Sequence, residues 1–84
     1  MVREIKNIVS TMKDIIIGGT YLHYKQKKYK VIDIARHSET LEEVVIYEAL
    51  YENRLGKIWV RPKSMFLEDV VVGNYSGPRF KYIG

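Results

Sequence analysis

The fold of this chain depends on the structure of residues 41–51, LEEVVIYEALY. Thr40 and Glu43 have the spacing of a capping box, which would start a helix at this point. Residues 44–47, VVIY, are instead β-branched or aromatic, as is typical of strands. A helix here would leave the neighbouring strand-like segments without pairing partners. We therefore predict a strand over residues 41–51.

Shorter strand-like segments flank this stretch on both sides. Residues 21–25 and 29–36 are rich in aromatic and β-branched side chains, and the short polar connection between them suits a hairpin. Farther along we predict a turn at 53–56, a strand at 57–61 that Pro62 ends, and a short 3₁₀ or tight turn at 63–65. A strand at 67–72, a loop at 73–78 and an edge strand at 79–83 would follow. The fold class is therefore mainly β, a small antiparallel five- or six-stranded barrel of the Src-homology-three-like kind, which hides its edges.

The predicted core of this barrel consists of apolar side chains from the strands and from the turn near residue 66. They are Val31, Ile32, Ile34, Val44, Ile46, Ile58, Val60, Phe66, Val70 and Phe80.

The first eighteen residues have a different hydrophobic period. Between residues 3 and 16 the apolar side chains recur at intervals of three and four, which predicts an amphipathic helix packed on one side or end of the barrel. The pair Gly18-Gly19 would end it, because glycine accepts the left-handed conformation common at helix C-termini. The alternative is a strand over residues 14–18, since its three isoleucines are stiff at χ1. We predict the helix.

Length and composition bound the organisation of the chain. The 84 residues fit a single domain over 1–84, made of a helix-like addition at 1–18 and a β module at 19–84. The sequence contains no cysteine, which excludes disulfides, zinc–thiolate sites and cysteine nucleophiles, and we expect no metal or other cofactor. A small domain without disulfides fits a reducing compartment, and we found no convincing targeting or membrane segment. We therefore predict a cytoplasmic protein without membrane contact.

The formal net charge of +4 is the remainder of three blocks of opposite sign. Residues 1–38 carry a net +5, residues 39–53 carry five Glu and no base, and residues 54–84 carry a net +4. Pairing between the acidic block and the basic blocks would leave little charge for a polyanion. Charge alone therefore does not identify a nucleic-acid binder.

From residue 19 onward the sequence resembles a family of small bacterial proteins known as domain of unknown function family 1653. The resemblance rests on five ordered blocks: residues 19–25 GTYLHYK, 35–40 ARHSET, 45–51 VIYEALY, 58–62 IWVRP with Met65-Phe66, and 78–80 PRF. It covers about four fifths of the chain, which makes a chance match improbable. The resemblance implies a compact, mostly β domain and brings no activity with it.

One group of candidate binding residues lies on predicted strand faces. Tyr21 and His23 share a face, as do Trp59 and Arg61, because side chains alternate along a strand. His23 is expected to be a hydrogen-bonded histidine at a barrel seam. The Arg61 guanidinium could stack on a ring, hold a carboxylate or phosphate, or pair with a glutamate of the acidic block. We favour the ion pair.

A second group is the polar stretch at residues 36–40, which is the predicted tip of a hairpin. Arg36, His37 and Glu39 combine donors with an acceptor and could bind an anion or a polar ligand. Ser, Thr and Glu side chains in such a stretch also close turns by bonding to the backbone, with His37 left in solvent. We favour this structural role.

These patterns favour a non-catalytic binding or adaptor module for a protein or peptide. The expected binding surface, at one mouth of the barrel, comprises Tyr21, His23, Arg36, His37, Glu39, Trp59 and Arg61. Single-stranded nucleic-acid binding is the alternative, because basic residues alternate with aromatic ones. Small-ligand binding, or an enzyme built on His23, His37, Arg36 and Glu39, is a weaker hypothesis, since the common catalytic motifs do not occur. A homodimer formed through the N-terminal helix is a separate hypothesis.

Overall fold

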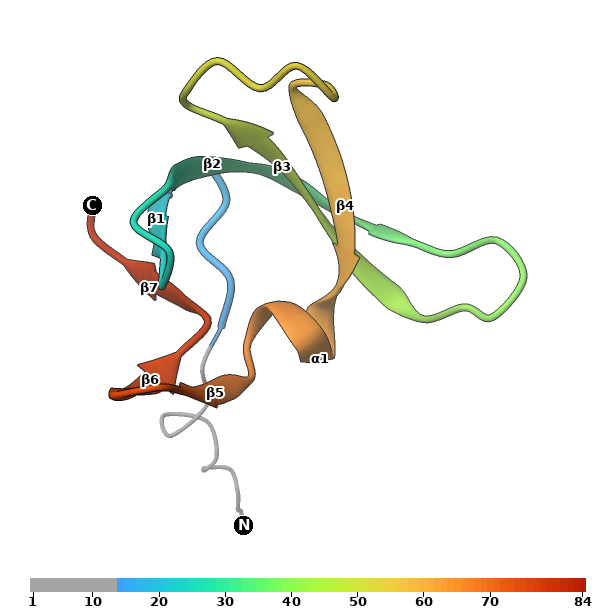
Figure 1. Ribbon diagram of the computed structural model, residues 1–84. Coiled ribbons are helices and arrows are strands. Elements are labelled where there is room, and N and C mark those ends of the chain that lie inside the picture. Colours follow the sequence, from blue (N-terminus) through green and yellow to red (C-terminus); the bar gives the residue numbers. More distant parts are fainter. Residues whose placement is uncertain (1–13) are drawn as a thin grey trace, which may run out of the picture.

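The strand predicted across residues 41–51 is present in the computed structural model as β3 (Glu43–Ala49). The structure describes residues 14–84. Four further strands share a sheet with it: β1 (Thr20–His23), β2 (Lys28–Arg36), β4 (Ile58–Pro62) and β7 (Phe80–Tyr82). Their order is β4-β3-β2-β1-β7, with every neighbouring pair antiparallel. The sheet curls around an interior that the chain between β4 and β7 closes from below (Figure 1).

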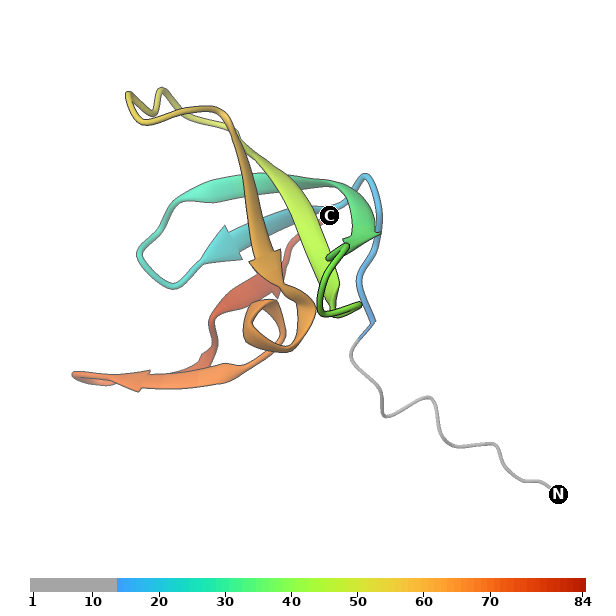
Figure 2. The same ribbon diagram turned by 90° about the vertical axis from the view of Figure 1, so that its right-hand side faces the viewer.

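The remaining elements connect the two edges of this sheet. One turn of helix, α1 (Lys63–Phe66), follows β4 directly, and β5 (Asp69–Val72) and β6 (Tyr75–Pro78) then form a separate two-stranded hairpin. Figure 2 shows this hairpin below the curled sheet. Phe66 of α1 is fully buried, so the single helical turn serves to place one ring in the core.

Several sequence predictions are confirmed. The hairpin joining 21–25 to 29–36 is β1 and β2, paired with Tyr21 opposite Tyr29. The turn at 53–56 closes through a bond from the Gly56 amide to the Asn53 carbonyl oxygen at 3.1 Å. Residues 79–83 contain β7, an edge strand of the large sheet, as expected.

The prediction of a barrel is wrong, because the sheet does not close. β4 and β7 are its two edges, and among residues 14–84 no backbone ladder joins them. The chain leaving β4 turns into α1 and then into the separate hairpin, and β7 is only three residues long. Side chains bridge the opening instead: the rings of Phe66 and Phe80 stack with their centres 4.0 Å apart.

The predicted N-terminal helix is not found where the structure describes it. Residues 14–16 have no regular structure, and residues 17 and 18 form a turn. The Gly18 amide bonds to the carbonyl oxygen of Val31 at 2.8 Å, so this segment runs beside β2, and Ile15 is buried in the core. Stiff, consecutive isoleucines favour such an extended course over a helix. The rest of the predicted helix, residues 3–13, lies outside the described residues.

The predicted loop at 73–78 is also wrong, since it contains β6. Gly77 and Pro78 argued against a strand, yet they pair with Val70 and Asp69 of β5. Each strand of a two-stranded sheet has only one partner, so a proline can stand where no ladder bond is required.

Half of the predicted core lies on the wrong face of its strand. Val31, Phe66, Val70 and Phe80 are buried as expected, but β3 directs Val45, Tyr47 and Ala49 inward in place of Val44 and Ile46. Ile58 and Val60 of β4 are 57% and 61% exposed. Ile32 is also exposed, because it is the extra residue where the β2 register shifts. Aromatic rings fill much of the interior, and the strand positions that carry them are the ones that face inward.

One glycine is required by the way the chain packs at the start of β1. A Cβ atom on Gly19 would lie 2.8 Å from the ring of Tyr82 and 2.9 Å from the Ile16 carbonyl oxygen. Only glycine lets the chain pass this closely before entering the sheet.

Candidate functional site

The inward-facing rings gather around Phe80 of β7. The ring centres of His23, Tyr29 and Tyr47 lie 4.9, 5.7 and 5.5 Å from that of Phe80, in edge-to-face contacts. The guanidinium carbon of Arg61 lies 5.6 Å from the same centre. We call Phe80 and its neighbours His23, Tyr29, Tyr47, Phe66 and Arg61 the Phe80 cluster. All five strands of the large sheet therefore supply its side chains, together with α1.

Alternation along the strands explains why these residues meet. His23 is paired with Phe80 across β1 and β7, and Arg61 lies opposite Val45 across β4 and β3, so both side chains point inward. Trp59, two residues before Arg61, packs against the core, and its indole N–H donates to the Gly56 carbonyl oxygen at 3.0 Å. His23, Tyr29, Trp59 and Arg61 are each half-buried. Solvent therefore reaches the margin of the cluster, whereas Tyr47, Phe66 and Phe80 are buried.

His23 is held as a neutral imidazole. Its Nδ1 accepts a hydrogen bond from the Lys25 backbone N–H at 3.1 Å, which leaves the proton on Nε2. Burial of the ring, followed by the positive charges of Arg61, Arg79 and Lys25, lowers the pKa of His23 to about 4. The expected hydrogen-bonded histidine is therefore present, at the edge of the aromatic cluster.

Arg61 does not form the ion pair that we favoured. Its Nε donates to the Tyr47 hydroxyl at 3.4 Å, and its charge lies over the Phe80 ring. Two of the candidate glutamates pair with lysines instead: Glu48 lies 3.0 Å from Lys57, and Glu43 lies 3.4 Å from Lys63. Within residues 14–84, no carboxylate lies at ion-pair distance from Arg61.

Tyr29 and Tyr51 extend the cluster toward the loop after β3. Their hydroxyl oxygens are 2.5 Å apart, and the Nζ of Lys27 lies 4.9 Å from the Tyr51 ring centre. Burial and the contact with Tyr51 raise the pKa of Tyr29 well above its ordinary value. Tyr29 therefore acts as a neutral hydrogen-bonding group.

The second group of candidate residues lies apart from this cluster. Arg36, His37 and Glu39 belong to the β2–β3 hairpin, whose tip extends away from the rest of the fold (Figure 1). His23 precedes β2 and His37 follows it, so the two histidines lie at opposite ends of one nine-residue strand. The expectation that all seven residues converge at one mouth is therefore wrong.

The hairpin tip is closed by its own side chains, as the structural interpretation expected. Arg36 Nη1 donates to the Leu41 carbonyl oxygen at 2.8 Å, and Thr40 Oγ1 accepts from the Glu42 amide at 3.2 Å. His37 does more than remain in solvent, because its Nδ1 accepts from the Glu39 amide at 3.1 Å. Arg36 Nη1, His37 Nδ1 and Thr40 Oγ1 are therefore engaged in closing the turn.

Tyr21 has a core role. Its side chain is 4% exposed, and its hydroxyl accepts a hydrogen bond from the Ile16 amide at 3.1 Å. This hydrogen bond attaches the segment before β1 to the sheet.

Tyr29 and Tyr47 belong to the site but were not among the residues predicted from the sequence. Tyr29 lies opposite Tyr21 in the β1–β2 hairpin, so the rings of Tyr21 and Tyr29 are on the same face of the sheet.

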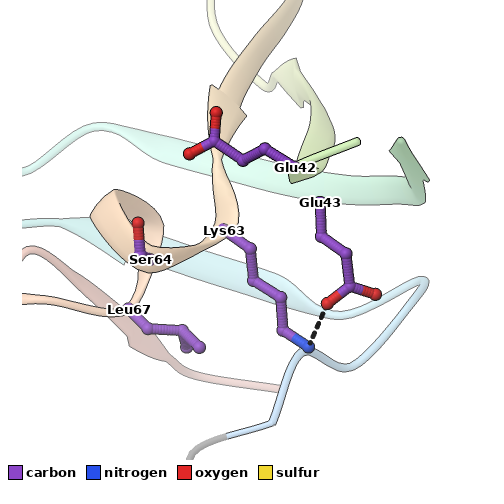
Figure 3. Close-up of a pocket in the computed structure, with 5 residues that line it drawn as sticks. All are labelled: Glu42, Glu43, Lys63, Ser64 and Leu67. Atoms are coloured by element: carbon purple, nitrogen blue, oxygen red, sulfur yellow. Dashed lines mark hydrogen bonds and ion pairs between the residues drawn. The ribbon is translucent and has the colours of Figure 1, made fainter. Parts of the chain in front are cut away.

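A polar pocket of about 430 Å³ lies between β3 and α1 (Figure 3). It is lined by Glu42, Glu43, Lys63, Ser64 and Leu67. The Lys63 ammonium lies 3.4 Å from Glu43 and 3.8 Å from Asp14, so neighbouring carboxylates already balance its charge. Lys63, the cation that lines this pocket, therefore does not need a ligand to balance its charge.

Across residues 14–84, no three His, Asp or Glu side chains are grouped so that they could hold a metal ion. None of the helices in this part of the chain has the length and apolar character to cross a membrane.

The open sheet with its aromatic cluster defines a small, mainly β domain that has an aromatic interior with an arginine at its margin. The chain belongs to the family described as protein of unknown function (DUF1653), whose model matches residues 19–82. The family resemblance inferred from the sequence is thereby confirmed. A crystal structure of a member of this family from Bordetella bronchiseptica has 36% sequence identity and a TM-score of 0.76, over 82% of this chain and 88% of that one. The comparison with curated proteins gave no match.

Proposed function

We propose that this protein is a non-catalytic binding module that takes up an extended segment of a partner protein alongside β4. The observation that carries the proposal is that β4 is an edge of the five-stranded sheet, with one side of its backbone unpaired within the described chain. An extended peptide can add a strand to such an edge, gaining affinity from main-chain hydrogen bonds and specificity from alternate side chains.

The register identifies the free backbone groups. The Ala49 amide donates to the Lys57 carbonyl oxygen at 2.8 Å, so Lys57 and then Trp59 and Arg61 direct their backbone groups toward β3. Ile58 and Val60, between them, direct theirs to the open side. Pro62, the next outward position, has no N–H to offer and marks the end of the usable edge.

The side chains of β4 also favour a partner. Natural edge strands are commonly protected by charge, by a bulge or by very short length. The outer face of β4 instead exposes Ile58 and Val60, and its register with β3 is regular along the whole strand. On the inner face, Trp59 and Arg61 are half-buried and within reach of an added strand.

The rings support a protein segment over single-stranded nucleic acid. Nucleic-acid binders of this size offer free aromatic faces on which bases stack. Here Tyr29 makes edge-to-face contacts with Tyr47, Tyr51 and Phe80, and Phe80 stacks on Phe66. Because these rings pack against one another, main-chain hydrogen bonding at β4 is the better supported mode of binding.

The test uses a phage-displayed library of random nine-residue peptides, selected on the intact protein. We expect selected synthetic peptides to bind about tenfold more weakly to Val60→Pro, which removes an outward N–H and blocks the approaching strand. Val60→Ala is the matched control, since it keeps the N–H, and both variants are checked by circular dichroism and thermal melting. Equal binding to Val60→Pro and Val60→Ala would contradict the proposal. So would retention on immobilised single-stranded RNA or DNA that weakens linearly with log salt, with no peptide selected.

A further inference from the structure

We infer that the segment taken up by β4 carries an acidic side chain whose carboxylate binds Arg61. This inference rests on the proposed function and names the chemistry of the partner. It starts from a charge that the described part of the fold leaves unbalanced.

Arg61 is half-buried and lacks a carboxylate partner within residues 14–84. Partial burial removes water from a charged group, which is costly unless a counter-charge compensates. Other buried or half-buried cations of this protein have one: Arg79 lies 3.5 Å from Glu68, and Lys63 lies near both Glu43 and Asp14. Among the described residues, Arg61 instead contacts the Tyr47 hydroxyl and the face of the Phe80 ring. It is therefore the cation in this region that an incoming anion would stabilise most.

The surroundings of Arg61 add to the positive potential. The pKa of the His23 imidazole is lowered by burial and then by Arg61, Arg79 and Lys25, in that order, which shows that these charges act on one small region. Within residues 14–84, Lys25 makes a contact with the Tyr24 ring, and Arg79 is the one of these three cations with an acidic partner. A negative charge entering beside Arg61 would meet attraction from several directions.

The guanidinium is also oriented for a carboxylate. Its Nε is engaged by the Tyr47 hydroxyl, so the two terminal nitrogens remain as donors. Two parallel N–H groups match the two oxygens of a carboxylate, which makes such contacts both strong and specific for geometry.

Strand addition would bring a carboxylate to this position. Inward side chains of a strand paired with β4 would lie about 4.5–5.5 Å, Cβ to Cβ, from Trp59 and Arg61. Glu at the position facing Arg61 reaches the terminal nitrogens, and the inward residue two positions away faces the Trp59 indole. The expected segment therefore combines an acidic residue with an apolar or aromatic one at i and i+2.

The experiment measures selected peptides against matched variants. In each Val60→Pro-sensitive peptide, every Glu or Asp is replaced in turn by Gln or Asn. We expect one replacement to weaken binding to the wild-type protein about tenfold and to have little effect on binding to Arg61→Met. Arg54→Met is the control, because it removes an exposed guanidinium from the β3–β4 loop. Arg61→Lys, which keeps the charge but not the fork, should recover only part of the loss.

The outcomes separate this inference from the proposed function. Peptides that respond to Val60→Pro but tolerate every neutral replacement would overturn the acidic segment and leave strand addition standing. Peptides that bind the Val60→Pro variant as tightly as the wild-type protein would contradict the proposed function, and the inference that rests on it would also be wrong. Because the replacements are made in the peptide, the comparison on the wild-type protein stands even if Arg61→Met does not fold.

Discussion

The guanidinium carbon of Arg61 on β4 lies 5.6 Å from the ring centre of Phe80 on β7, so a side-chain contact spans the two edges of the sheet. Backbone bonds between these edges would have closed a barrel. Within the described part of the chain, one side of the β4 backbone is instead unpaired, and Arg61 lies at the margin of an aromatic interior. The unpaired edge of β4 and the position of the Arg61 guanidinium therefore have the same cause, which is that the sheet does not close between β4 and β7.

Phe80 is expected to contribute more to stability than most other side chains, because it contacts β1, β2, β3, β4 and α1. Phe80→Ala should lower the free energy of unfolding by about 3–5 kcal/mol, measured by urea denaturation. Val71→Ala is the control, since Val71 is 80% exposed and its truncation should change stability by less than about 0.5 kcal/mol. A similar loss in both variants would mean that the rings do not form the core.

The inward direction of Val45 and the outward direction of Val60 are tested by a pair of identical changes. Val45 is 0% exposed and Val60 is 61% exposed. We expect Val45→Ala to cost about 2 kcal/mol, since two buried methyl groups are lost. Val60→Ala should cost about 0.5 kcal/mol or less. The reverse order in chemical denaturation would show that the faces of the strands had been assigned incorrectly.

His23 predicts a pH dependence of stability. Its folded-state pKa of about 4 lies below the ordinary value of 6.5, so between these pH values the unfolded chain binds more protons than the folded one. The stabilisation is complete above pH 6.5 and is lost as the pH falls through 4. Because the ring is partly exposed, we expect a contribution of about 1 kcal/mol after discounting for solvent.

The measurement compares the free energies of unfolding of wild type and His23→Gln from pH 7 to pH 4. Carboxylates titrate in both proteins, so the difference between the two curves isolates the histidine. An NMR titration of the His23 ring protons gives the pKa directly. A midpoint near 6.5 would contradict burial of the ring beside Arg61 and Arg79.

Local sequence patterns were sufficient for much of the strand order. The β-branched run at 44–47 overrode a capping-box spacing, and the structure has β3 there. Pro62 ended β4 and the polar residues 26–28 closed a hairpin, because proline and short polar turns act within a few residues. The loop at 73–78 was missed, since the pairing of Gly77 and Pro78 depends on a partner strand and not on their own propensities.

The candidate site was only partly accessible from the sequence. Alternation correctly placed Trp59 with Arg61 on one face, but their ring neighbours Tyr29 and Tyr47 were not included. All four residues 44–47 are apolar, so hydrophobicity could not show which pair faces inward. The choice is made by Phe66 and Phe80, whose rings come from distant segments and pack on Tyr47.

By itself the sequence determined a mainly β domain, the family to which the chain belongs and the positions of most strands, because these depend on neighbouring residues. Only the tertiary structure decided whether the sheet closes, which face of each strand is buried and whether Arg61 finds a counter-charge. Those properties depend on contacts between residues far apart in the chain. The +4 net charge illustrates the difference: Glu43 and Glu48 of β3 pair with Lys63 of α1 and Lys57 of the β3–β4 loop, as the charge blocks suggested, while the Arg61 guanidinium lies beside Phe80.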